Sequence, residues 1–198
     1  MTTRYSFDGA CLIDSFSSKL VCCVKNDINS YKIPASVTKI GESAFYDCSL
    51  LKSIKIPDSI TEIGKSAFYN CSSLKSIKIP GSVTEIGKSA FDGCRSLESI
   101  ELPDSVDEIG VAAFNGCNSL NDVNIFNTTR LIIDGNNESK IRTTRYSFDG
   151  TCFIDNLNNR LICCSKNDID SYKIPDSVTE IGNWAFDGCS SFKSIKLH

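Results

Sequence analysis

The sequence predicts a solenoid, in which similar short units stack along one axis and their strands form a parallel β-sheet. The first observation is a proline that recurs every 23 residues, at Pro34, Pro57, Pro80 and Pro103. An Ile-Gly pair and an Ala-Phe pair keep the same spacing, and a fifth copy follows Pro175. A period of this length is typical of repeat arrays, in which no unit buries its apolar face without its neighbours.

Each unit is expected to contain a turn, a short extended segment, a helical or 3-10 turn, and then a strand. Around Ser76, alternation predicts that Ile77 and Ile79 point inward and that Lys78 points outward. The proline ends the strand. The glycine of each unit is expected to allow a backbone bend, and the Ala-Phe pair to supply close packing and a core ring.

A second kind of unit occurs twice. Residues 2–34 and 143–175 are near copies separated by 141 residues, which is not a multiple of the repeat. In the first copy, β-prone residues 11–14 and 19–24 flank a serine-rich turn, a pattern that predicts a hairpin. The block therefore is expected to open an array of regular repeats.

The chain is predicted to form one continuous solenoid over residues 1–198. Its expected parts are a hairpin-bearing repeat (2–34), four regular repeats (35–125), an irregular connecting coil (126–142), a second hairpin-bearing repeat (143–174) and a final repeat (175–198). The last residues form a strand without a polar cap. Either the chain is cut from a longer array, or this end packs against another molecule.

The composition is that of a folded chain. It has 198 residues, 41% hydrophobic and 23% charged, with a net charge of -3, too small to indicate a nucleic acid or an anionic membrane as partner. No apolar run approaches the roughly 20 residues of a membrane helix, and the first residues lack the apolar core of a secretory signal. As written, the chain is expected to be cytoplasmic.

Eleven cysteines could form disulfides, bind metal or fill the core. Five occupy one repeated slot, which favours a column of buried free thiols. Metal sites of the paired-cysteine kind are not expected, because the only histidine is His198. The odd number of cysteines fits a reducing compartment, whereas disulfides would favour export. The expected core column is Cys48, Cys71, Cys94, Cys117 and Cys189 with Phe45, Phe68, Phe91, Phe114 and Phe186.

No catalytic residue or cofactor is expected. The vicinal pairs Cys22/Cys23 and Cys163/Cys164 lie in strands, where alternation turns one thiol inward and the other outward. A catalytic cysteine would need a histidine base, and His198 is terminal. No glycine-rich phosphate loop is present.

The repeat Ile-Pro-x-Ser-Val-Thr-x-Ile-Gly-x-x-Ala-Phe-x-x-Cys-x-x-Leu-x-x-Ile resembles the BspA-like leucine-rich repeats. It is carried by residues 33–54, 56–77 and 79–100 and, with small changes, by residues 102–123 and 174–195. The resemblance covers almost the whole chain. It implies a right-handed leucine-rich-repeat solenoid with a parallel sheet on one face and short helical or 3-10 turns opposite. It also implies a surface antigen or adhesin that binds a protein, such as a host matrix or plasma glycoprotein.

A partner is expected on the sheet face. Stacked strands lie about 4.8 Å apart, so the outward residues at one repeat position form a charged column along this face. A solvated face without a partner is the alternative. Trp184 replaces the small residue of its column, and either anchors a partner or covers the open end of the array. The expected partner-binding residues are Lys32, Lys52, Lys55, Lys75, Lys78, Glu98, Glu101, Asn124, Lys173, Trp184, Lys193 and Lys196.

Three functional hypotheses remain. The first is a non-enzymatic adhesin or surface antigen, and the second is an intracellular scaffold that binds a cytosolic protein. The third is a structural array that associates with copies of itself through the uncapped coil that ends near Leu197.

Overall fold

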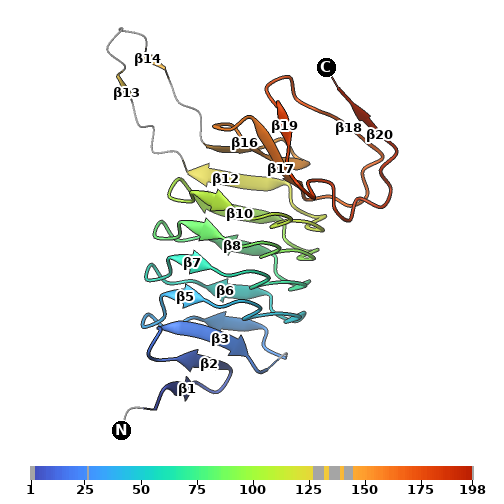
Figure 1. Ribbon diagram of the computed structural model, residues 1–198. Coiled ribbons are helices and arrows are strands. Elements are labelled where there is room, and N and C mark those ends of the chain that lie inside the picture. Colours follow the sequence, from blue (N-terminus) through green and yellow to red (C-terminus); the bar gives the residue numbers. More distant parts are fainter. Residues whose placement is uncertain (1–2, 26, 127–131, 134–138, 141–144, 198) are drawn as a thin grey trace.

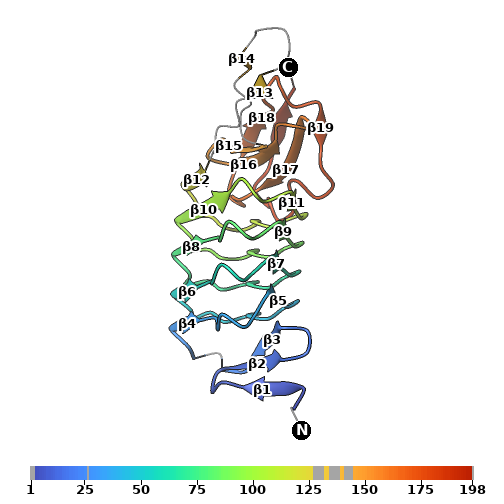
Figure 2. The ribbon, with the colours of Figure 1, turned by 90° about the vertical axis from the view of Figure 1, so that its left-hand side faces the viewer.

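Each regular coil contributes two short parallel strands, and the two sets of strands form sheets on different sides of a solenoid (Figure 1 and Figure 2). The structure is a computed structural model that describes residues 3–25, 27–126, 132–133, 139–140 and 145–197. We call the side formed by the strand near the end of each repeat the strand face. Its strands in the first array are β4 (Ser30–Lys32), β6 (Ser53–Lys55), β8 (Ser76–Lys78), β10 (Ser99–Pro103) and β12 (Asp122–Phe126).

The second sheet contains the short extended segment of each unit. It runs in the order β1-β2-β3-β5-β7-β9-β11, and its regular strands pair in parallel because the repeats stack in register. Proline separates each strand of the strand face from the strand of the second sheet that follows it. The regular strands are β5 (Lys39–Ile40), β7 (Glu62–Ile63), β9 (Glu85–Ile86) and β11 (Glu108–Ile109).

The Ala-Phe segments are turns, so the expected helical or 3-10 turns are not seen. Their backbone N–H groups alternate between the next coil and their own segment: Phe45 N donates to Ala67 O at 2.7 Å, whereas Tyr46 N donates to Ser43 O at 3.1 Å. Bonds between coils therefore replace every second bond that a continuous helix needs. No helix lies among the described residues, and none there could span a membrane.

The backbone reversal occurs two residues after the repeated glycine. Ser43, Ser66 and Ser89 have φ of 56°, 52° and 52°, in the left-handed region, whereas the glycines at 41, 64 and 87 do not have positive φ. The expectation that glycine makes the bend is wrong. Gly87 is required for another reason, because a Cβ there would lie 2.6 Å from the backbone N of Lys65.

The core is a set of columns along the solenoid axis. Phe45, Phe68, Phe91 and Phe114 are fully buried, and neighbouring rings stack with centroids 5.1, 5.2 and 5.3 Å apart. Beside them, each cysteine thiol donates to the phenylalanine carbonyl of the preceding coil. The three such bonds join Cys71 to Phe45, Cys94 to Phe68 and Cys117 to Phe91, at 3.1, 3.2 and 3.2 Å.

Each hairpin block folds as three antiparallel strands rather than two, because residues 5–7 and 146–148 add an edge strand to the expected hairpin. The last strand of each block then pairs in parallel with a regular coil, β3 with β5 and β17 with β19 (Glu180–Ile181). The strands are β1 (Tyr5–Phe7), β2 (Cys11–Asp14), β3 (Lys19–Cys23), β15 (Tyr146–Phe148), β16 (Cys152–Asp155) and β17 (Arg160–Cys164).

The second block lies between two coils, so both faces of its sheet are buried. Phe153 and Cys163 pack on the first array, and Cys152 and Cys164 face the second core. Alternation along the strand therefore holds, but Cys163 and Cys164 are both only 1% exposed. The expectation that one of the pair points outward is wrong for this block.

A disulfide joins Cys152 and Cys164, so the expectation of reduced cysteines fails at this pair. The two residues lie directly opposite each other in the antiparallel ladder of β16 and β17, which places their side chains side by side. Cys11 and Cys23 hold the same positions in β2 and β3 and remain thiols.

The connecting segment 126–142 lies mostly outside the described residues. Within its described part, β13 (Ile132–Ile133) pairs with β14 (Ser139–Lys140) in antiparallel orientation. The two arrays also meet directly, because the ring of Phe153 stacks on Phe114 with centroids 4.5 Å apart. Beyond the second block, β18 (Ser171–Lys173) pairs with β20 (Ser194–Lys196) on the strand face of the final coil.

Candidate interaction surfaces

The strand face carries the predicted charged columns. The register places Lys32 beside Lys55, Glu101 between Lys78 and Asn124, and Lys173 beside Lys196. These side chains are exposed, except for half-buried Glu101. The face therefore changes along its length from basic to mixed and back to basic.

The second column lies one step before each strand. Lys52, Lys75 and Glu98 are exposed, and their backbones are joined in series, with Glu98 N donating to Lys75 O at 2.8 Å. Lys193 is also exposed and forms an ion pair with Asp170 at 3.2 Å. The structure thus brings the two columns together on one side, but distributes them over two arrays.

A pocket of about 310 Å³ opens on the strand face between the second and third strands. Lys55, Lys78 and Asp58 are its charged lining residues, and the other lining residues are apolar. Lys78 also pairs with Glu101 at 3.0 Å. The lining combines an excess of positive charge with apolar residues, which suits an acidic side chain next to an apolar one. Its lining residues are Ile54, Lys55, Ile56, Pro57, Asp58, Lys78 and Pro80.

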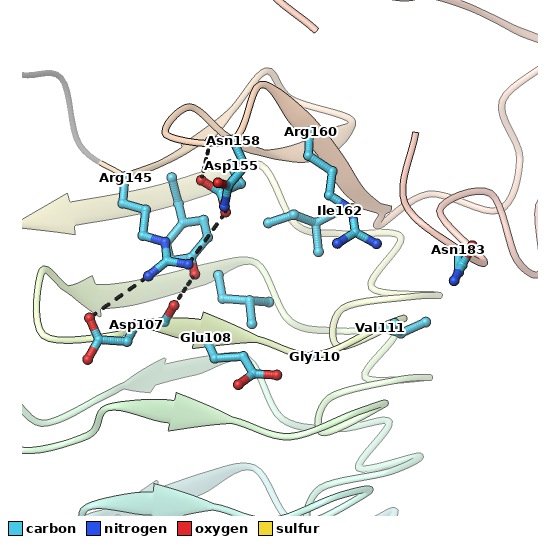
Figure 3. Close-up of a pocket in the computed structure, with 12 residues that line it drawn as sticks. Asp107, Glu108, Gly110, Val111, Arg145, Asp155, Asn158, Arg160, Ile162 and Asn183 are labelled. Carbon is cyan, nitrogen blue, oxygen red and sulfur yellow. Dashed lines mark hydrogen bonds and ion pairs between the residues drawn. The ribbon is translucent and has the colours of Figure 1, made fainter. Parts of the chain in front are cut away.

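A second pocket, of about 300 Å³, lies at the junction of the first array with the second hairpin block (Figure 3). Arg145 spans it, 3.9 Å from the Asp107 carboxylate and 3.6 Å from that of Asp155. Across the pocket, Arg160 pairs with Glu180 at 3.2 Å. Each arginine faces a carboxylate of the protein itself. The Arg145–Asp107 ion pair is therefore suited to hold the first array and the second hairpin block together.

Trp184 lies on the final coil with its side chain 67% exposed and φ of 62°. Elsewhere, the rings of Tyr46 and Tyr69 stack with centroids 4.8 Å apart, and Tyr46 is 47% exposed. Asp92 continues this tyrosine column on the next coil.

The pKa of Asp92 is raised to about 6, first by burial and second by the charge of Asp187. Folding therefore takes up a proton between the ordinary pKa of aspartate and pH 6, so stability falls as pH rises through this window and the cost persists above it. We expect Asp92→Asn to stabilise the chain at pH 7.5 by about 1 kcal/mol, allowing for partial exposure, and to have no effect below pH 4.

Thermal unfolding at both pH values tests this. Asp168→Asn, on an exposed residue, is the control and should change stability by no more than about 0.5 kcal/mol at either pH. An equal effect of Asp92→Asn at both pH values would show that charge at Asp92 does not cause it.

The expected core column lies inside the first array and is partly open in the last coil. Burial raises the pKa of the Cys48 thiol to about 12 and that of Cys71 further, so these thiols stay protonated. Cys189 and Phe186 are half-buried, because none of the described residues forms a further coil on theirs. Among the described residues, no group of three or more acidic, histidine or cysteine side chains could hold a metal.

Sequence reasoning missed both pockets. The Arg145–Asp155 pair repeats Arg4–Asp14 of the first block, where the guanidinium contacts the carboxylate at 3.1 Å. The duplication could therefore have indicated the ion pair. It could not indicate that Arg145 lines a junction while Arg4 is exposed.

Comparison with solved structures supports the architecture. A leucine-rich repeat protein from Bacteroides ovatus is 26% identical with a TM-score of 0.55, over 100% of this chain and 66% of that one. One from Bacteroides capillosus is 26% identical with a TM-score of 0.56, over 63% of this chain and 100% of that one. The pneumococcal vaccine antigen PcpA is 25% identical with a TM-score of 0.50, over 86% of this chain and 45% of that one.

No curated protein matches the chain. The family model described as the BspA type leucine-rich repeat region matches residues 19–139 and 159–198 in 6 copies. Its repeats are of the kind that forms protein-interaction modules and is typically non-enzymatic. The chain belongs to the BspA-type leucine-rich repeat family.

Proposed function

We propose that the chain is a non-enzymatic surface antigen or adhesin module that binds a protein partner through its strand face. The observation that carries this proposal is the pocket beside Lys55 and Lys78, where two basic groups and one carboxylate, Asp58, lie among apolar lining residues. Extended sheet faces are the usual binding surfaces of solenoids. The partner would present an acidic side chain beside an apolar one.

Two further observations support a surface role over an intracellular scaffold. The Cys152–Cys164 disulfide favours an oxidising compartment. The similarity to PcpA, a vaccine antigen, points the same way. A host matrix or plasma glycoprotein is the class of partner to test first.

The test is saturable binding of the chain to an immobilised panel of matrix and plasma glycoproteins. Lys55→Glu combined with Lys78→Glu should weaken binding at least about tenfold, because charge reversal at a buried contact costs more than 1.4 kcal/mol. Lys39→Glu combined with Lys65→Glu is the matched control. It makes the same change in net charge at exposed lysines on the second sheet side.

Equal binding by the two double variants would contradict a site at this pocket. Absence of saturable binding by the native chain to any member of the panel would contradict the adhesin role. Thermal unfolding of each variant excludes loss of structure as the cause.

A further inference from the structure

The two hairpin blocks carry the same face in two different surroundings. In the second block, this face packs against the fourth coil of the first array. Tyr146, Phe153 and Cys163 are 5%, 0% and 1% exposed there. In the first block, the same positions are Tyr5, Leu12 and Cys22, of which Tyr5 is 48% exposed and the other two are half-buried.

The internal junction shows what this face is built to receive. Tyr146 donates its hydroxyl to Asp107 O at 2.8 Å, and Asn167 N donates to the Asn118 side chain at 3.0 Å. The Phe153 ring continues the phenylalanine column of the coil beneath it. The occupant of the face is therefore the open end of a regular coil.

The final coil, residues 175–197, exposes the matching side chains. Ile181 is 42% exposed, whereas Ile109, its equivalent in the fourth coil, is 7% exposed beneath the second block. Leu197 is 72% exposed, whereas Ile174, one coil earlier, is 2% exposed. These side chains belong to inward columns that are covered wherever another layer is stacked on them.

We infer that the outward face of the first hairpin sheet binds the final coil of a second copy, in the arrangement of the internal junction. Tyr5 then takes the place of Tyr146 and donates to the backbone carbonyl of Thr179, the equivalent of Asp107. Leu12 packs on Phe186 as Phe153 packs on Phe114. Because the two surfaces are different, the contact is head-to-tail and extends into chains of copies. The inference is independent of the strand-face site.

The contact between copies is weaker than the internal one. Ser190 and Lys193 replace Asn118 and Asn121, which bond to the second block. The two sides of the internal junction also belong to one chain, which gives them an effective concentration of about 1 mM. Sedimentation should therefore cover about 10 μM to about 1 mM.

The native chain should show a weight-average mass that rises with concentration beyond that of a dimer. Leu12→Asp disables the head and Leu197→Asp disables the tail, so each variant alone should remain monomeric. An equimolar mixture of the two should form dimers and stop there, because it contains one intact head for each intact tail. Trp184→Ala makes the final coil match Ala112 of the fourth coil and should associate at least as strongly as the native chain.

Four results would overturn the inference: a monomeric native chain at all concentrations, undiminished association of either single variant, no dimer in the mixture, or loss of association in Trp184→Ala. Unfolding midpoints establish that the variants fold. Tyr5→Ser, on the exposed edge strand, replaces Leu12→Asp if that variant does not fold. Lys55→Glu with Lys78→Glu should associate like the native chain, which separates this contact from the strand-face site.

Discussion

Phe91→Ala is expected to lower the free energy of unfolding by about 3–5 kcal/mol. Phe91 is fully buried and stacks on Phe68 and Phe114 with centroids 5.2 and 5.3 Å away. Removal of its ring deletes contacts with both neighbours and leaves a cavity between two coils. Because each coil of a solenoid is stabilised only by its neighbours, the loss cannot be shared with a distant part of the core.

Denaturant titration of the native chain and the variant measures this effect. Phe16→Ala is the matched control: the same substitution at a side chain that is 70% exposed should cost less than about 0.5 kcal/mol. A loss below about 1 kcal/mol for Phe91→Ala would show that the phenylalanine column does not hold the coils together.

The repeat pattern predicted the stacking because each repeated position maps to one column. The period placed Phe45, Phe68 and Phe91 in line and put Lys55 next to Lys32 without any further information. The local backbone was harder to predict. Whether the Ala-Phe segment forms a helix depends on where its N–H groups donate, and every second acceptor, such as Ala67 O for Phe45 N, belongs to another coil.

The hairpin blocks show a different limit. Near-identical sequences give Tyr5 and Tyr146 very different burial because of what lies beside each block, and that information is not local. The disulfide has the same character, since Cys11 and Cys23 match Cys152 and Cys164 in sequence and register yet remain thiols.

The candidate site was predicted only in part. Alternation identifies which side chains point outward on the strand face, so the columns follow from sequence. The pocket beside Lys55 does not, because it depends on how β6 and β8 are spaced, and these strands belong to different hydrogen-bonded sheets. The proposed partner site on the strand face and the proposed contact between copies involve separate surfaces, so the two proposals can be tested independently.

Gly87→Ala is expected to lower the free energy of unfolding by about 2–4 kcal/mol, although it adds only a methyl group. The new Cβ would lie 2.6 Å from Lys65 N and 2.7 Å from Gly64 C, which are backbone atoms of the preceding coil. Neither can turn aside as a side chain would. Gly87 N also donates to Ile63 O at 2.8 Å, so separating the coils to make room weakens this hydrogen bond.

Gly81→Ala provides the control within the same coil. A Cβ at Gly81 has open space, with no atom within 4 Å, and its φ is not positive, so the substitution should be neutral or stabilise by about 0.4–1 kcal/mol through the unfolded chain. Denaturant titration of the two variants side by side measures the difference. If they are equally stable, close approach of coils at the glycine column does not limit the repeat. A large loss in Gly87→Ala alone would mean that this glycine sets the spacing at which the phenylalanine rings and the cysteine thiols make their contacts.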